Sequence, residues 1–275
     1  MRHPLDSLQR YFDADGCALL ADATAYRARF AGFDLHSHFQ PLISARTLRP
    51  QACEALLRAR PVDSGGPFIP PAVALAAAAT PAEAVLLDRL CRVLHALNFA
   101  RQAHDDLDLY LNVSGRHLLG VSHGYGRTFE EMLKLCGLSP RQVVLEILES
   151  SVDDLPRLQQ AVATYKQRGF RIAIDDFGAR HSNFDRLWHI SPDVVKLDRG
   201  LIEQATCNPR AALILPRLIG MLQELGARVV CEGIETERQH ALCVAAGADL
   251  LQGYFYARPA AQLAPATASP LATFA

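Results

Sequence analysis

The chain has 275 residues, half of them hydrophobic, which is enough to bury one large core, so we expect a single domain. Its 28 basic and 29 acidic residues nearly cancel, which excludes a bulk field that would attract nucleic acid or an anionic membrane. Its seven cysteines are scattered and form no C-x-x-C pair, as is typical of a reducing compartment. Since we find neither a signal peptide nor about 18 consecutive apolar residues, we expect a soluble, cytoplasmic protein.

The two ends of the chain differ from its middle. Residues 1–33 precede the first β-favouring run, and we expect an N-terminal helical extension that is broken at Gly16. Residues 34–260 are expected to form the main folded unit. Residues 261–275 are rich in alanine and proline, which predicts a disordered tail. Within the main unit, residues 61–71 indicate a loop and residues 72–79 are low in complexity.

Short β-favouring runs alternate with helical stretches along the main unit, a pattern that predicts parallel strands covered by helices. Eight such runs in a chain of this length favour an α/β fold of the (β/α)8, TIM-like barrel type, with an open doubly wound sheet as the alternative. Two helix starts are marked by a capping-box spacing, at Thr80 and at Thr236. The eight runs are 35–42, 52–57, 107–113, 143–148, 171–174, 193–197, 228–231 and 250–256.

Acidic, amide and basic residues stand at the carboxyl ends of these apolar runs. A single such residue is more often a helix cap or a solvated loop group than a ligand. In a barrel, however, the carboxyl ends of the strands meet on one face, and unpaired charges there are costly, so a shared cation or ligand is the simplest explanation. The residues are Asn112, Glu146, Asp175, Asp176, Lys196, Glu232 and Gln252.

The types of donor indicate which metal is expected. Carboxylate and amide oxygens suit Mg²⁺ or Mn²⁺, whereas zinc prefers cysteine and histidine. His36 and His38 share one strand face, but no third histidine has the spacing to complete a metal site, so partly buried strand residues are the better interpretation. The sequence also lacks the GxxxxGK[ST], HExxH and GxSxG motifs, which argues against P-loop, zincin and α/β-hydrolase chemistry.

Ordered motifs across residues 34–259 resemble those of the EAL phosphodiesterase family. Gln40-Pro41 and Glu54-Ala55-Leu56-Leu57-Arg58 are similar to its opening signature. The later matches are Asn112-Val-Ser114, Glu146-Ile-Leu-Glu149-Ser150, Asp175-Asp-Phe-Gly178, Lys196-Leu-Asp198, Glu232-Gly-Ile-Glu235-Thr236 and Gln252-Gly253.

The resemblance implies a modified (β/α)8 barrel that hydrolyses cyclic di-GMP to linear pGpG with two divalent cations, Mg²⁺ or Mn²⁺. It implies one cation on Glu54, Asn112, Glu146 and Asp175, and a second on Asp175, Asp176 and Glu232. The implied catalytic residues are Glu54, Lys196, Glu232, Glu235 and Gln252. The implied substrate-binding residues are Gln40, Leu57, Arg58, Asn112, Asp198 and Gln252, with Glu149 supporting the loop after Asp175-Asp176.

The chain departs from the family pattern in three places. Residues 179–183 replace a commonly found T-G-Y-S-S run, Leu148 replaces a threonine, and the acidic residues that usually follow Phe68-Ile69-Pro70 give way to alanines. A non-hydrolysing cyclic di-GMP receptor on the same barrel is therefore the main alternative, and a barrel enzyme acting on another phosphate ester is a weaker one. The resemblance also implies a homodimer, and no cyclase sequence accompanies the domain.

Overall fold

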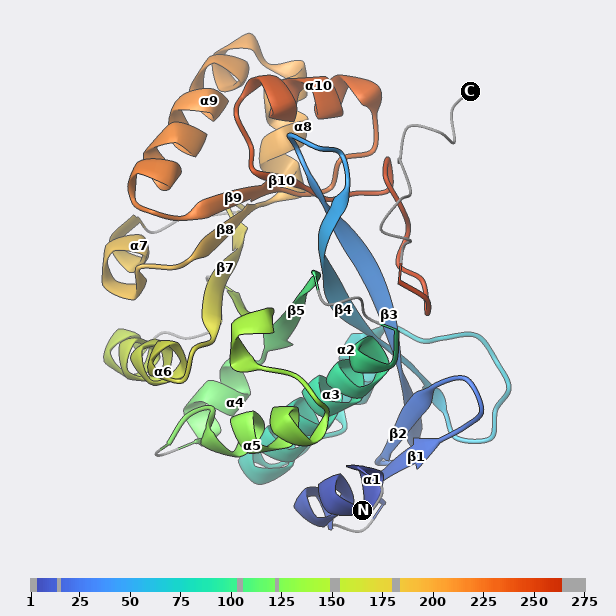
Figure 1. Ribbon diagram of the computed structural model, residues 1–275. Helices are drawn as coiled ribbons and strands as arrows, with labels where there is room; N and C mark the ends of the chain where they lie inside the picture. The colour runs from blue at the N-terminus through green and yellow to red at the C-terminus, as the bar shows by residue number, and fades with distance from the viewer. Residues whose placement is uncertain are drawn as a thin grey trace.

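The computed structural model describes residues 4–13, 16–102, 106–121, 124–148, 154–179 and 184–263. Within these ranges ten strands form one sheet, and eight of them close into a barrel with helices on its outside (Figure 1). The predicted modified (β/α)8 barrel in a single domain is confirmed. The strands are β1 (Ala18–Ala21), β2 (Tyr26–Phe30), β3 (Phe33–Ser44), β4 (Pro50–Pro61), β5 (Asp108–Val113), β6 (Val143–Leu148), β7 (Arg171–Phe177), β8 (Val194–Leu197), β9 (Arg228–Cys231) and β10 (Leu250–Leu251).

Helices follow most of the strands, and both predicted capping boxes are confirmed. The Thr80 hydroxyl accepts from the Glu83 N–H at 3.2 Å while the Glu83 carboxylate accepts from the Thr80 N–H at 2.8 Å, and Thr236 and Gln239 repeat the pattern. No helix in the described ranges is long and apolar enough to cross a membrane. The helices are α1 (Pro4–Gln9), α2 (Pro71–Ala76), α3 (Pro81–Gln102), α4 (Gly115–Gly120), α5 (Arg127–Leu135), α6 (Leu155–Gln167), α7 (Phe184–Ile190), α8 (Arg199–Cys207), α9 (Pro209–Glu224) and α10 (Glu237–Ala245), with short 3₁₀ helices η1 (Arg10–Phe12) and η2 (Pro140–Gln142).

One strand of the barrel runs against the other seven. Strand β3 is antiparallel to both of its neighbours, β4 and β10, whereas the remaining neighbours in the barrel are parallel. The prediction of parallel strands throughout was wrong at this point. Only residues 45–49 separate β3 from β4, and so short a link makes a hairpin but cannot span a parallel crossover. Gln40 of β3 therefore lies opposite Glu54 of β4.

The N-terminal extension is only partly helical, which corrects the prediction for residues 1–33. Helices α1 and η1 cover residues 4–12, but β1 and β2 continue the sheet beyond β3. Asn98 of α3 holds β2 in place, because its side chain accepts from the Tyr26 N–H at 2.8 Å and donates to the Tyr26 carbonyl at 2.9 Å. The extension is thus joined to the barrel sheet. Of the predicted tail, residues 264–275 lie outside the described residues.

Two rings of side chains lie inside the barrel. The lower ring is apolar and has one residue from every strand. Because side chains alternate along a strand, the residue two positions nearer the barrel mouth points inward as well, and in all eight cases that residue is polar. Six of these polar residues belong to strands, and Glu232 and Gln252 directly follow β9 and β10. The apolar ring consists of Leu42, Ala52, Tyr110, Val144, Ala173, Val194, Val230 and Leu250. The polar ring consists of Gln40, Glu54, Asn112, Glu146, Asp175, Lys196, Glu232 and Gln252.

The last predicted strand, 250–256, is shorter than expected. Strand β10 ends at Leu251, and the chain turns back over the loop that follows β9. Gly253 allows this crossing, since it has a φ of +157° and a Cβ at its position would lie 2.0 Å from the Ile234 carbonyl oxygen. The Phe255 N–H donates to the same oxygen at 3.0 Å. Gly253 therefore fixes the segment that carries Gln252.

We predict that Gly253→Ala destabilises the protein by about 3 kcal/mol, because the new methyl group overlaps backbone atoms that cannot move aside. Gly226→Ala is the matched control, since Gly226 also has a positive φ but no atom within 4 Å of a Cβ, and strain alone costs about 1 kcal/mol. Urea unfolding of both variants measures the difference. Equal losses of stability would show that the crossing at Gly253 is not tight.

Candidate active site

Lys196 lies at the centre of the polar ring and contacts four carboxylates, three from strands and one from the residue that follows β9. The lysine is 1% exposed and Glu146 is fully buried. The structure therefore brings the predicted strand-end residues together, and in the described residues four carboxylates share one ammonium group. Its Nζ lies 2.6 Å from Glu146 Oε1, 2.7 Å from Glu232 Oε1, 3.0 Å from Asp175 Oδ1 and 3.2 Å from Glu54 Oε2.

Amide side chains connect the remaining members of the ring. The Asn112 Nδ2 donates to Glu54 and to Glu146 at 3.2 Å each. The Gln252 Nε2 donates to Glu54 at 2.9 Å and to Gln40 at 3.4 Å. Glu54 thus accepts from two amides as well as from Lys196, which fixes its orientation. Asn112 presents its nitrogen to the carboxylates here, so ligation of a cation by its oxygen requires the amide to turn over.

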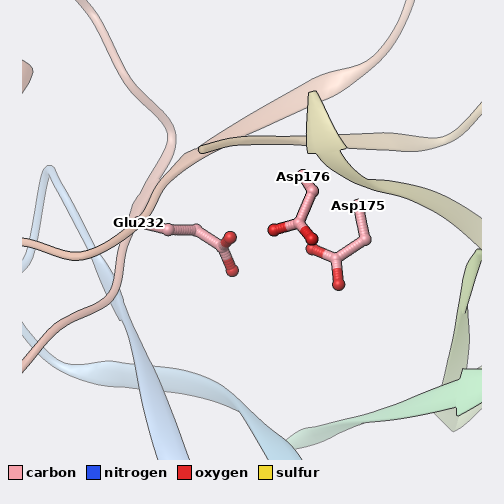
Figure 2. Close-up of side chains that lie close together, drawn as sticks. All are labelled: Asp175, Asp176 and Glu232. Carbon is pink, nitrogen blue, oxygen red and sulfur yellow. The ribbon is translucent and has the colours of Figure 1, made fainter. Parts of the chain in front are cut away.

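Asp176 joins the ring through an irregularity in β7. Consecutive residues of a regular strand point to opposite faces, which would send Asp176 away from Asp175. The register with β8 shifts between Ile174 and Phe177, and Asp176 has a φ of +56°, a left-handed conformation that is rare for residues other than glycine. Figure 2 shows the result, in which the carboxylates of Asp175 and Asp176 point toward that of Glu232. Strain of this kind is typical of functional sites.

The ionisation of the ring reflects its excess of negative charge. Burial raises the pKa of Glu232 to about 8, although Lys196 opposes the shift. Burial also raises the pKa of Glu146, and the nearby Glu54 carboxylate adds to the rise. For Glu54 the effect of burial is outweighed by Lys196 and by the hydrogen bond from Gln252, so its pKa is lowered. Burial lowers the pKa of Lys196, but Glu146 and the other carboxylates raise it well above its ordinary value, so the lysine stays charged.

These residues fit divalent cations. The buried carboxylates outnumber the ammonium group, and part of the cluster holds protons at neutral pH unless more positive charge is supplied. One oxygen each from Asp175, Asp176 and Glu232 lie within 4.8 Å of one another. A donor set of oxygens alone suits Mg²⁺ or Mn²⁺.

A cavity of about 250 Å³ opens beside the ring. Besides ring members, its walls include Asp176, Asp198, Arg199, Glu235 and Tyr254. Asp198 caps α8 by accepting from the Gly200 N–H at 2.8 Å, and Glu235 accepts from Arg199 Nη1 at 2.8 Å. Both predicted residues therefore line the cavity without touching Lys196. Arg199 and Tyr254 were not predicted as site residues, although each directly follows a motif of the sequence, Lys196-Leu-Asp198 and Gln252-Gly253 respectively.

Strand β4 continues beyond the ring and determines which residues can face the cavity. Arg58 lies on the same face as Glu54, and its Nη1 donates to the Leu57 carbonyl at 3.0 Å. Leu57 points to the opposite face, where it packs against the main hydrophobic core. Leu57 was predicted to bind substrate, but adjacent strand residues face opposite ways, so it points away from the cavity and Leu56 holds the inward position beside Arg58. Glu149 lies outside the described residues.

His36 and His38 lie on the same face of β3, as predicted, and both imidazoles pack against an aromatic ring. Each imidazole lies 5.4 Å from the ring of Phe68 in an edge-to-face arrangement. Burial lowers the pKa of both histidines, so both are neutral at pH 7. Neither belongs to the cluster of potential cation ligands.

We predict that Lys196→Met costs about 3 kcal/mol of stability at pH 8 in the presence of EDTA, because it leaves four carboxylates, three of them buried, without their cation. The control, Lys166→Met, removes a lysine that is 32% exposed and pairs with Asp193, and should cost less than about 1 kcal/mol. Urea unfolding measures both.

The loss of stability caused by Lys196→Met should be smaller at pH 5.5 than at pH 8. Burial raises the pKa values of Glu146 and Glu232, and Lys196 opposes both shifts. Without the lysine both pKa values rise further, so above the ordinary pKa of 4.5 the folded variant takes up more protons relative to its unfolded state than the wild type does. The stability of the variant therefore rises more than that of the wild type as the pH falls. A loss that is the same at both pH values would show that carboxylate repulsion is not its cause.

Comparisons with known proteins bear on what this site is. The family model described as EAL domain matches residues 23–259. The cyclic di-GMP phosphodiesterase RocR of Pseudomonas aeruginosa is 32% identical over 159 residues, which cover 58% of this chain and 40% of RocR. The chain spans less than half of the length of the curated relatives it matches.

Solved structures are similar over most of the chain. The c-di-GMP-bound form of a standalone EAL protein from Vibrio cholerae has a TM-score of 0.71 at 26% identity, covering 84% of this chain and 95% of that one. The manganese and cyclic di-GMP complex of BlrP1 from Klebsiella pneumoniae has the same fold, with a TM-score of 0.74 at 23% identity, covering 94% of this chain and 65% of that one. The chain belongs to the EAL domain family.

Proposed function

We propose that this chain is a metal-dependent phosphodiesterase that hydrolyses cyclic di-GMP to linear pGpG. The observation that carries the proposal is the complete polar ring, in which four carboxylates surround Lys196 beside a cavity. The relative RocR, by its name, acts on cyclic di-GMP. The family membership and the chemistry of the ring therefore support the same activity.

Two divalent cations are part of the proposal. Glu54, Asn112, Glu146 and Asp175 would hold one, and Asp175, Asp176 and Glu232 would hold the other. When bound, such a pair supplies Lewis acidity that stabilises negative charge on the phosphodiester as it opens. The oxygens of Asp175, Asp176 and Glu232 are already close enough to share a small cation.

Lys196 acts as a hydrogen-bond donor in this proposal. Because its pKa is raised well above the ordinary value, it does not serve as a general base at neutral pH. Held between Asp175 and Glu232, its ammonium can orient the attacking water. The water oxygen bonds to phosphorus, the bond from phosphorus to the 3′ oxygen breaks, and the proton released by the water is balanced by one taken up at that oxygen.

Residues around the ring would hold the nucleotide. Arg58, on the same face of β4 as Glu54, is placed to contact a phosphate. Asp198, Glu235 and Tyr254 line the cavity. Gln252 holds Glu54 by donating to its carboxylate, and the same Gln252 amide also donates to Gln40. Leu56 replaces Leu57 in the proposed contact surface, since Leu57 packs against the core.

The direct test incubates the purified protein with cyclic di-GMP and Mn²⁺ or Mg²⁺ and separates the products by chromatography. We predict pGpG from the wild type and at least about 100-fold slower turnover from Glu54→Gln, because the amide carries no charge for a cation. Glu224→Gln, on the exposed end of α9, should be as active as the wild type. Near-native turnover by Glu54→Gln would show that Glu54 is not a cation ligand in the active site.

Arg58→Ala should raise KM for cyclic di-GMP by about 10-fold and change kcat less, because it removes a phosphate contact made before and during the reaction. Arg46→Ala, in the exposed turn at the other end of the β3–β4 hairpin, is the control. Steady-state kinetics with saturating Mn²⁺ give both constants. An unchanged KM would place the phosphate away from Arg58.

A cyclic di-GMP receptor without hydrolytic activity is the second candidate. It is favoured by Leu148, which is 39% exposed at the end of β6 where the family has a threonine, and by the altered segment 179–183, of which only Ala179 is described. Calorimetric binding of cyclic di-GMP without any pGpG in the assay would support the receptor. The family resemblance also implies a homodimer, which is compatible with either function. Light scattering measures the mass of the protein in solution and tests this.

A further inference from the structure

A second group of buried charges lies outside the active-site cavity, between α3, α4 and α6. The group, here called the Asp88 cluster, consists of Asp88, Arg92, His117 and Tyr165, none of which is more than 7% exposed. Asp88 forms an ion pair with Arg92 one turn along α3, and its Oδ2 lies 3.2 Å from His117 Nδ1. His117 Nε2 lies 3.3 Å from Arg92 Nη2 and 3.4 Å from the Tyr165 hydroxyl.

The ionisation of the cluster follows from these contacts. Burial lowers the pKa of His117 to about 4, which outweighs the opposite effect of Asp88, so the imidazole is neutral at pH 7. Its Nε2 can then accept from Arg92. The guanidinium also lies over the ring of Phe129, 4.4 Å from its centroid. Arg92 and Asp88 therefore balance each other in a dry environment.

One oxygen of Asp88 reaches beyond the cluster to the active-site strand. Asp88 Oδ1 accepts from the Ser114 N–H at 2.8 Å. Ser114 is the residue at which β5 gives way to α4, and it caps that helix by accepting from the Arg116 N–H. It stands two residues after Asn112, whose amide bonds to Glu54 and Glu146. The chain of contacts thus runs from α3 through the end of β5 into the polar ring.

Stability alone is a poor explanation for such a pair. Replacing a buried ion pair by apolar side chains of similar size is often neutral or stabilising, because removing two charges from water is costly. In the described residues, Nε and Nη1 of Arg92 have no hydrogen-bond acceptor, so the guanidinium does not even use its full donor capacity. What apolar side chains could not do is accept the Ser114 N–H.

We propose that Asp88, held in place by Arg92, is a positioning residue that fixes Asn112 against Glu54 and Glu146. Removing the acceptor frees the turn at Ser114, and the Asn112 amide no longer stays within hydrogen-bond distance of both carboxylates. Arg92 acts one step further away, by neutralising and orienting Asp88. The consequence for turnover rests on the proposed phosphodiesterase function, whereas the consequence for the position of Asn112 does not.

Two double variants separate positioning from mere stability. Asp88→Leu with Arg92→Met removes both charges and the acceptor, while Asp88→Asn with Arg92→Met removes both charges but keeps a carbonyl oxygen for the Ser114 N–H. Urea unfolding shows whether the two variants are equally stable. Calorimetry with Mn²⁺ and the pGpG assay give affinity and turnover, and crystal structures of both variants without metal give the distances from Asn112 Nδ2 to Glu54 and Glu146.

At similar stability, we expect the Leu/Met variant to bind Mn²⁺ and to turn over substrate about 10-fold less well than the Asn/Met variant, with its Asn112 amide beyond hydrogen-bond distance of one or both carboxylates. Equal Mn²⁺ affinity, equal turnover and an Asn112 amide bonded to both carboxylates in both variants would overturn the proposal and leave the cluster a structural feature. If the wild type itself makes no pGpG, the phosphodiesterase proposal fails, and the two crystal structures still decide whether Asp88 positions Asn112.

Discussion

The ammonium group of Lys196 and the carboxylates around it are the interaction on which the site depends. Four carboxylates from β4, β6, β7 and the end of β9 lie in one largely buried space, each at 2.6 to 3.2 Å from the same nitrogen. Such a cluster opposes folding, because each carboxylate loses its water and repels the others. The apolar ring beneath it and the helices outside the barrel must outweigh that cost. The same unbalanced charge makes the site suited to cations.

The reversed strand β3 shapes the surroundings of the cluster. As one arm of a hairpin, it brings Gln40 beside Glu54 and carries the sheet on past the ring, where Arg58 lies on the inner face of β4. A parallel β3 would have ended with its neighbours at the mouth. The hairpin therefore offers a wall for a ligand larger than a single phosphate, as the proposed dinucleotide substrate requires.

Much of the site could be predicted from the sequence because it follows a period of two. Each inward polar residue stands two positions from an inward apolar one, so Glu146 after Val144 and Lys196 after Val194 were visible in the strands themselves. The ordered motifs then pointed to the family. Leu57 shows the limit of such a pattern, since a shift of one residue moves a side chain to the other face.

Other features depend on three-dimensional contacts that no local pattern encodes. Asp176 reaches the site only because β7 changes register beside β8, and a regular strand would have turned it away. In the sequence Asp88 is an ordinary helix residue, and only the folded structure shows that it accepts a hydrogen bond from the Ser114 N–H. The strands β1 and β2 form because β3 offers them an edge and Asn98 holds Tyr26, whereas their sequence alone suggested a helix.

The central claim is that the polar ring is a binding site for divalent cations, and anomalous diffraction from crystals soaked in Mn²⁺ tests it most directly. We predict strong anomalous peaks among the oxygens of Asp175, Asp176 and Glu232 and between Glu54 and Glu146. Diffraction from such crystals with no peak in the ring, while Lys196 stays bonded to all four carboxylates, would contradict it.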